Sequence, residues 1–229
     1  MGIIEKIWKI SNNPYSIYIR GSYANLERKH TPWDLDIYLI TTKKESINIQ
    51  EISKNLDYQY PNLPTLDLTI ITKHDLFELE EHILKRLLLI CGSNLVKGKA
   101  LKNTINQPIL NKETSIKIKK IMHEFVFTKI TEMKLKRDTE RKENLNFISK
   151  KISKMLIRTG VFIGIEEYNV FSRDINYCYE NLIKKHPNLK PYVDEIYQVL
   201  GGRDIDFSKF LNYAEIIKNT VYHEPEFNT

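Results

Sequence analysis

Cysteine is scarce in this sequence, which holds only Cys91 and Cys178 among its 229 residues. Two cysteines so far apart argue against a disulfide scaffold and leave too few sulfur ligands for a structural zinc site. We expect both to be small apolar side chains of the core, in a protein of the reducing cytoplasm. The six histidines show no His-x-x-x-His spacing, so a histidine metal site is not expected either.

Long apolar runs are also lacking, because no stretch reaches the roughly 18 apolar residues that a membrane-spanning helix needs. The sequence therefore predicts no membrane segment. Glycine and proline, eight of each, form no low-complexity segment. A chain of 229 residues allows one large domain or two small ones with a sizeable core.

Acidic residues are outnumbered, with 29 Asp and Glu against 35 Lys and Arg and a net charge of +6. The basic excess gathers between Lys112 and Arg158. A positive balance weakly favours anionic partners such as nucleotides or nucleic acid. A solvated, lysine-rich helix face explains the same run and is its more common meaning.

The first hundred residues alternate between helical and strand patterns. We expect helices over residues 2–10 and 44–56, and strands over residues 15–20, 34–41 and 65–72. A short helix is possible over residues 23–29, and residues 30–33 read as a connector. This order predicts an α/β sheet.

The rest of the chain shows only helical periodicity. Apolar spacing predicts helices within residues 76–88, 118–126, 145–156, 175–183, 193–200 and 210–221. Gly160 is expected to stop the third of these, and Ser172 to cap the fourth. The boundary between the two halves falls near residues 98–112, where Lys, Asn, Gln and Pro cluster.

Three carboxylates stand out within the expected strands. Asp34 and Asp36 are two residues apart on one strand and therefore project to the same side, whereas Leu35 and Ile37 point to the opposite, packed side. Asp67 lies inside a later apolar run. Paired carboxylates repel unless cations neutralise them, and Mg²⁺ prefers a few carboxylates together with phosphate oxygens and water. The pattern predicts a divalent-cation site.

A Gly-Ser turn precedes this site. Gly21 permits a close backbone approach or a positive φ, and Ser22 offers a hydroxyl and a backbone N–H to phosphate. A triphosphate whose tail meets this turn would place its α-phosphorus near the cations. That arrangement favours transfer of a nucleoside monophosphate with pyrophosphate as the leaving group.

The combination resembles the polymerase-β-type nucleotidyltransferase superfamily: Gly-Ser, eleven further residues, Asp-x-Asp among apolar residues, and a later Asp in an apolar run. The resemblance implies that Asp34 and Asp36 bind two Mg²⁺ ions and that Asp67 binds one of them and helps to activate an acceptor hydroxyl. It also implies that Ser22 contacts the terminal phosphates and that Gly21 is structural.

The resemblance extends loosely beyond this motif. Residues 90–98 look like the short strand and glycine turn that follow the core in many members, and the helical half is similar in layout to that of aminoglycoside nucleotidyltransferases. The implied fold class is α+β, a small mixed-sheet nucleotidyltransferase core followed by an all-helical bundle domain. We assign residues 1–100 to the catalytic domain and residues 110–229 to a helical substrate-binding domain.

Other candidate residues have simpler explanations beside the functional one. Lys150 and Lys154 lie on one expected helix and are candidates for binding the triphosphate, although lysines at such positions are commonly surface residues. A second Asp-x-Asp, Asp204 and Asp206, has no Gly-Ser at the right spacing and no strand, so acids at the start of the last helix explain it better.

The predicted reaction is Mg²⁺-dependent transfer of a nucleoside monophosphate, AMP from ATP in our interpretation, to an acceptor hydroxyl. The acceptor is predicted on RNA or protein, as in toxin–antitoxin or defence systems. One alternative is an antibiotic nucleotidyltransferase acting on a small molecule. A second is an inactive member of the fold that serves as a binding module.

Overall fold

The computed structural model describes residues 2–24, 34–45, 48, 52, 65–105, 108–136 and 142–222. The chain divides into two compact units, Met1–Pro108 and Ile109–Thr229. Most of the short helix offered over residues 23–29, the connector expected at residues 30–33 and most of the helix expected over residues 44–56 lie outside the described residues.

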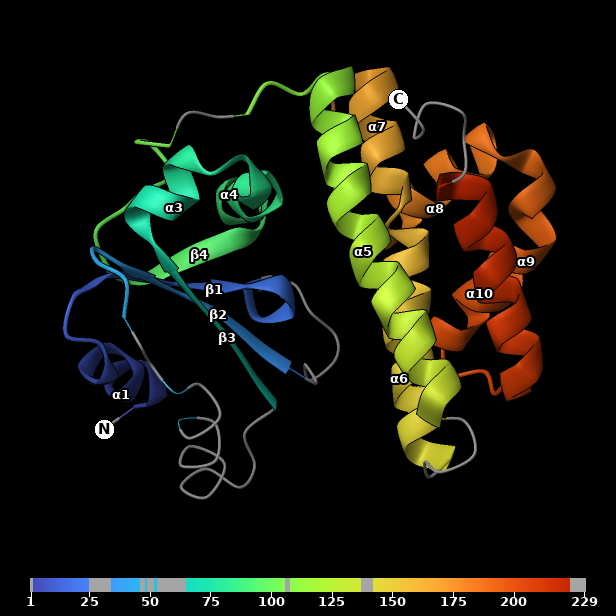
Figure 1. The fold of residues 1–229 in the computed structure, drawn as a ribbon, viewed down its shortest axis with the longest axis horizontal. Coiled ribbons are helices and arrows are strands. Elements are labelled where there is room, and N and C mark those ends of the chain that lie inside the picture. Colours follow the sequence, from blue (N-terminus) through green and yellow to red (C-terminus); the bar gives the residue numbers. More distant parts are fainter. Residues whose placement is uncertain are drawn as a thin grey trace. The chain divides into compact units, whose positions relative to one another are not determined.

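Within the described residues, the first unit is built on a four-stranded mixed sheet (Figure 1). Its strands are β1 (Pro14–Arg20), β2 (Asp34–Thr41), β3 (Thr65–Thr72) and β4 (Ser93–Gly98), in the spatial order β3-β2-β1-β4. β1 pairs antiparallel with β2 and with β4, whereas β2 and β3 run parallel. The inner strands β1 and β2 therefore carry neighbours on both sides.

One face of this sheet packs on the amphipathic helix α1 (Ile3–Ile10). The alternation of the strands sends Ile17, Ile37 and Leu39 to that face, where they are fully buried with Ile7 of α1. Leu35, Leu66 and Leu68 extend the same core. The carboxylates that alternate with these leucines must consequently lie on the opposite face.

The opposite face carries Tyr18, Tyr38 and Ile40, all buried, and lies beneath α3 (Lys73–Glu78) and α4 (Ile83–Gly92) (Figure 1). Helix α3 follows β3 directly, and its start is capped by Thr72, whose Oγ1 accepts a hydrogen bond from the N–H of Asp75 at 2.9 Å. The one-turn η2 (Glu80–His82) joins α3 to α4. β4 begins at the residue after α4 ends.

The second unit is entirely helical in its described part. It consists of α5 (Lys112–Lys136), α6 (Lys142–Ile157), α7 (Gly160–Tyr168), α8 (Ile175–Lys185), η3 (Pro187–Leu189), α9 (Lys190–Leu200) and α10 (Phe207–Tyr222) (Figure 1). Its core is apolar and includes the fully or almost fully buried side chains of Ile118, Val126, Leu156, Phe162, Leu182, Ile196, Phe210 and Ile217.

Several helices differ from the sequence-based expectation. The single helix expected within residues 76–88 is divided into α3, η2 and α4. Gly160 begins α7 instead of marking the end of the helical segment, because α6 has already ended at Ile157. The cap of α8 is Asp174, whose Oδ1 accepts from the N–H of Tyr177 at 2.9 Å, and not Ser172. Ser172 instead accepts from the N–H of Asp174 at 3.2 Å, which stabilises the turn before the helix.

No helix in the described ranges combines the length and apolar character that crossing a bilayer requires.

Candidate functional site

Three neighbouring strands bring Arg20, Asp36 and Asp67 together on one face of the sheet. Asp36 of β2 is the register partner of Asp67 on the parallel strand β3 and of Arg20 on the antiparallel strand β1. Register partners on adjacent strands have Cα atoms about 5 Å apart and side chains on the same side. Asp36 is thus the centre of a row of three charged side chains.

Arg20 binds both carboxylates through one nitrogen. Its Nη2 lies 3.3 Å from Asp36 Oδ1 and 3.3 Å from Asp67 Oδ2. The side chains of Arg20 and Asp36 are each 15% exposed, whereas that of Asp67 is 55% exposed. Asp36 is therefore the sheltered member of the carboxylate pair, and Asp67 is the member that solvent or a substrate can reach.

Gly21 approaches the Asp36 carboxylate so closely that no side chain fits there. Gly21 has a φ of +65°, and a Cβ at this position would overlap Asp36 Oδ2 and lie 3.2 Å from Asp36 Cγ. The sequence-based expectation of a positive φ or a close approach at Gly21 holds in both respects. The turn continues as η1 (Gly21–Ala24), which contains Ser22.

The first acidic residue of the motif, Asp34, opens β2 and is the register partner of Thr65. It lies two residues before Asp36, so both occupy the same face of the strand. The side chains of Asp34 and Ser22 are outside what the structure describes, and their roles stay predictions. Among the described side chains, no group of three or more His, Cys, Asp or Glu residues is placed to hold a metal ion.

The described residues nevertheless fit a divalent cation. Asp36 and Asp67 present hard carboxylate oxygens, the ligand type that Mg²⁺ prefers. The two carboxylates are close enough for a single guanidinium nitrogen to contact both. The guanidinium of Arg20 therefore occupies a place that suits a cation shared between them.

A second cation, Lys85 of α4, lies near this row. Its Nζ is 3.3 Å from His82 Nδ1. Burial lowers the pKa of Lys85, and the positive charge of Arg20 lowers that pKa further, whereas the negative charges of Glu81 and Asp75 raise it. The pKa of His82 is lowered as well, first by burial and then by Lys85. The site thus combines acidic and basic groups under α4.

Sequence reasoning missed both Arg20 and Lys85. Arg20 alternates with Ser16 and Tyr18 on a strand that otherwise packs into the core, and a charged side chain at the end of such a strand is a signal in itself. Lys85 gave no such signal, because its neighbours Leu84, Leu87 and Leu88 mark an ordinary amphipathic helix.

Lys150 and Lys154 lie on α6 of the helical unit, one helical turn apart. They belong to a different unit from the carboxylates. Lys154 is exposed and Lys150 is partly buried. Their proposed contact with a triphosphate therefore stays a prediction.

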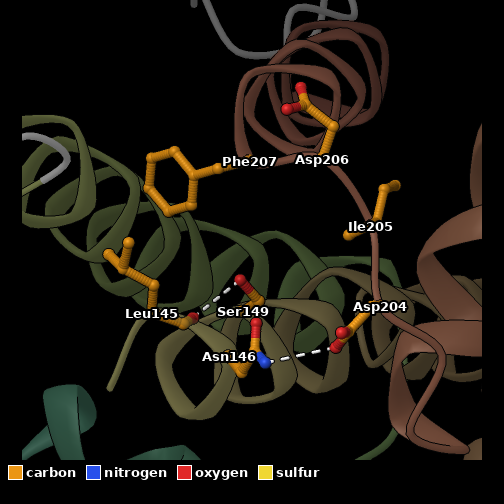
Figure 2. A pocket seen from close by; sticks show the side chains of 7 residues that line it. All are labelled: Leu145, Asn146, Ser149, Asp204, Ile205, Asp206 and Phe207. Carbon is orange, nitrogen blue, oxygen red and sulfur yellow. Dashed lines mark hydrogen bonds between the residues drawn. The ribbon is translucent and has the colours of Figure 1, made fainter. Parts of the chain in front are cut away.

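The second Asp-x-Asp serves the helical unit instead of a metal. Asp206 Oδ1 accepts a hydrogen bond from the N–H of Lys209 at 2.9 Å, as a residue capping α10 does. Asp204 Oδ1 accepts from Asn146 Nδ2 of α6 at 3.2 Å (Figure 2). Both line an open cavity of about 330 Å³ between α6 and the start of α10, but each has a structural partner.

Comparisons with known proteins identify a fold and not a family. No protein-family model matches the chain, and no curated protein matches its sequence. Among solved structures, the chain is similar to spectinomycin adenyltransferase AAD(9) from Enterococcus faecialis, solved with ATP and spectinomycin. The TM-score is 0.59 at 14% identity, over 95% of this chain and 97% of that one. The predicted α+β fold class, a small mixed sheet followed by a helical region, is confirmed.

Proposed function

We propose that this chain is a nucleotidyltransferase that moves AMP from ATP to an acceptor hydroxyl with the help of Mg²⁺. The observation that carries the proposal is the pairing of Asp36 with Asp67 in register, beside the close approach of Gly21. Its fold is that of an adenyltransferase solved with ATP, which supports the same class of reaction.

Each carboxylate has its own part in this proposal. Asp36, which is sheltered, holds the cations together with Asp34, and Asp67 completes the ligand set. Asp67 is also the accessible member of the pair and accepts the proton of the acceptor hydroxyl. Mg²⁺ supplies charge neutralisation at the oxygens of the transferred phosphoryl group.

The transfer itself makes one bond and breaks one. The acceptor oxygen bonds to the α-phosphorus of ATP, and the bond from that phosphorus to the oxygen bridging to the β-phosphorus breaks. Pyrophosphate leaves with the electron pair of that bond, and the hydroxyl proton passes to Asp67. Ser22 and the backbone of the turn at Gly21 hold the terminal phosphates, and Lys150 and Lys154 of the helical unit are further candidates to contact them.

The acceptor hydroxyl belongs to RNA or protein in this proposal. The positive balance of the sequence, +6 overall with its excess between Lys112 and Arg158, favours an anionic acceptor. A cationic antibiotic would instead favour an acidic pocket. The competing acceptor is a small molecule, as in the spectinomycin adenyltransferase that shares the fold.

The proposal is tested with α-labelled ATP, GTP, CTP and UTP in turn, each with Mg²⁺ and with total RNA, lysate protein or spectinomycin as acceptor. We expect label from ATP to enter RNA or protein and pyrophosphate to be released. The Asp36→Asn variant should lose at least about 100-fold in rate, because the electrostatic stabilisation of the transferred group is lost.

The matched control is Asp206→Asn, which changes the other Asp-x-Asp of the same chain. Because Asn caps a helix nearly as well as Asp, this variant should keep both its fold and full activity. Full activity of Asp36→Asn would overturn the site. If calorimetry shows binding of ATP and Mg²⁺ but no transfer occurs, the chain is a binding module and not an enzyme. If label enters spectinomycin, the acceptor is a small molecule and not RNA or protein.

A further inference from the structure

Arg20 is the one basic side chain that the described residues place in contact with both Asp36 and Asp67. It ends β1, and the register of the three strands puts it beside Asp36, with Asp67 one strand further. Its Nη2 lies 3.3 Å from an oxygen of each. A guanidinium in this position reduces the repulsion between the two adjacent negatively charged carboxylates.

The contacts that hold the Arg20 guanidinium are long and incomplete. Charge-assisted hydrogen bonds from a guanidinium to a carboxylate are typically about 2.7–2.9 Å long, so both contacts at 3.3 Å are long. Arg20 Nε is buried and finds no hydrogen-bond partner among the described residues. Such an unsatisfied donor opposes the arrangement. The Arg20 guanidinium is thus positioned by the carboxylates without being locked by a full set of partners.

Two further groups act on the Arg20 guanidinium besides the carboxylates. The ring of Tyr38 lies beneath it, with Arg20 Cζ 4.8 Å from the ring centroid. Arg20 and Lys85 are close enough for their positive charges to repel each other, and this repulsion lowers the pKa of Lys85. The guanidinium can therefore stay over the Tyr38 ring when the carboxylates bind another cation.

We infer that Arg20 is a displaceable internal cation: its guanidinium neutralises Asp36 and Asp67 until a divalent cation takes the same oxygens. Arg20 and the divalent cation then compete, because a single set of carboxylate oxygens does not serve both at contact distance. The inference rests on the proposed function for its assignment of the carboxylates to a cation site. It concerns cation binding alone and needs no turnover.

Competition between Arg20 and a divalent cation predicts the direction in which the affinity for that cation changes when Arg20 is removed. Removing Arg20 should tighten divalent binding, whereas removing a residue that merely supports the site should weaken it. Binding of Mn²⁺ to the full chain, followed by electron paramagnetic resonance without nucleotide, measures this directly. We expect Arg20→Met to lower the Kd for Mn²⁺ about tenfold, since a unit charge in contact with a carboxylate is commonly worth about one decade.

The matched control is Lys85→Met, which removes a positive charge from the same neighbourhood but from no described contact with the carboxylates. It should change the Kd by less than about threefold, because Lys85 makes no described contact with the carboxylates and the Coulomb interaction weakens with distance. Arg20→Lys keeps the charge and should give a Kd between those of the wild type and Arg20→Met. This second variant also serves if Arg20→Met does not fold.

Thermal unfolding gives an independent readout. In EDTA, Arg20→Met should unfold at a lower temperature than the wild type, because its carboxylates then repel without compensation. Adding Mg²⁺ should raise the unfolding temperature of the variant more than that of the wild type. Unchanged or weaker Mn²⁺ binding in both Arg20 variants would overturn the inference. Tighter binding without any nucleotide transfer would leave the inference standing and refute the proposed function.

Discussion

At the residue scale, Gly21 and Asp36 depend on each other. The positive φ of Gly21 turns the chain at the end of β1, and the missing side chain leaves room for the carboxylate that Arg20 contacts. Gly21 therefore does two separate things: it allows the backbone conformation and it makes space. A second glycine in the chain, Gly202, has the first property without the second, since a Cβ there would meet nothing within 4 Å.

This difference makes a paired prediction. Gly202→Ala should cost about 1–2 kcal/mol of the free energy of unfolding, from backbone strain alone. Gly21→Ala should cost about 1–3 kcal/mol more, because the new methyl group overlaps the Asp36 carboxylate. It should also weaken Mn²⁺ binding, which Gly202→Ala should not. Urea unfolding and Mn²⁺ titration measure the two effects, and equal losses in both variants would contradict the role of Gly21 in making space.

Strand alternation was enough to place Asp36 on the face opposite Leu35 and Ile37, and the apolar run around Asp67 marked that residue as a second candidate. It did not predict their contact with Arg20. That contact depends on the order of the strands and on their register, and the sequence pattern determines neither. The carboxylate roles of Asp34, Asp36 and Asp67 stay predictions that the experiments above address.

At the scale of elements, helix α7 shows where periodicity fails. Its residues from Gly160 to Ile165 are all buried, so most of the helix has no polar face and no amphipathic pattern to detect. Two glycines within it added a further signal against a helix. Helices α5, α6, α8, α9 and α10 each keep an exposed side, and the sequence predicted all of them.

The same glycines explain how α7 packs. A Cβ on Gly160 would overlap the carbonyl oxygen of Cys178 and lie 2.7 Å from its carbonyl carbon, both in the backbone of α8. A Cβ on Gly164 would instead lie 2.9 Å from the hydroxyl of Tyr177 and 3.0 Å from the side-chain nitrogen of Asn181. The two glycines thus meet neighbours that differ in their freedom to move.

We therefore expect Gly160→Ala to cost about 3 kcal/mol or more of the free energy of unfolding, because α7 and α8 must separate. Gly164→Ala should cost about 1 kcal/mol or less, because side-chain ends can rotate away and alanine favours the helix. Chemical denaturation of the two variants compares them. A smaller loss for Gly160→Ala than for Gly164→Ala would show that the two helices do not pack as described.

At the scale of the whole molecule, each compact unit holds one of the two cysteines. Cys178 is buried in the helical unit, as expected, whereas Cys91 of the sheet unit is exposed, so its expected place in the core was wrong. Burial raises the pKa of the Cys178 thiol to about 12. Since the thiolate is the reactive form, Cys178 is protected both by its low ionisation at neutral pH and by the lack of access.

Thiol labelling therefore reports on the helical unit. In a Cys91→Ser variant at pH 8, Cys178 should react with a thiol reagent only as fast as the helical unit opens, and fully in denaturant. In Cys178→Ala, the exposed Cys91 should react in the native state, although partial burial raises its pKa and slows it. Rapid native labelling of Cys178 would contradict its burial.

The raised pKa of Cys178 also predicts how stability depends on pH. The unfolded chain loses this proton near pH 9, whereas the folded chain keeps it up to about pH 12. The free energy of unfolding should therefore fall as the pH rises above 9, and this part of the fall should be absent in Cys178→Ala. Thermal unfolding of both variants across that range measures the difference.

The parallel pairing of β2 with β3 has a consequence for the order of folding. Parallel neighbours need a crossover between them, and the Arg20–Asp67 contact joins residues 47 positions apart. Closing so long a loop costs more conformational entropy than pairing strands that are close in sequence. Contacts between distant residues are therefore expected to form after contacts between near ones. A partly folded chain that holds β1 and β2 but not β3 has Asp36 beside Arg20 but lacks Asp67 next to them. The charged row is therefore complete only once β3 has joined β2, and the chain acquires its proposed cation site at that step.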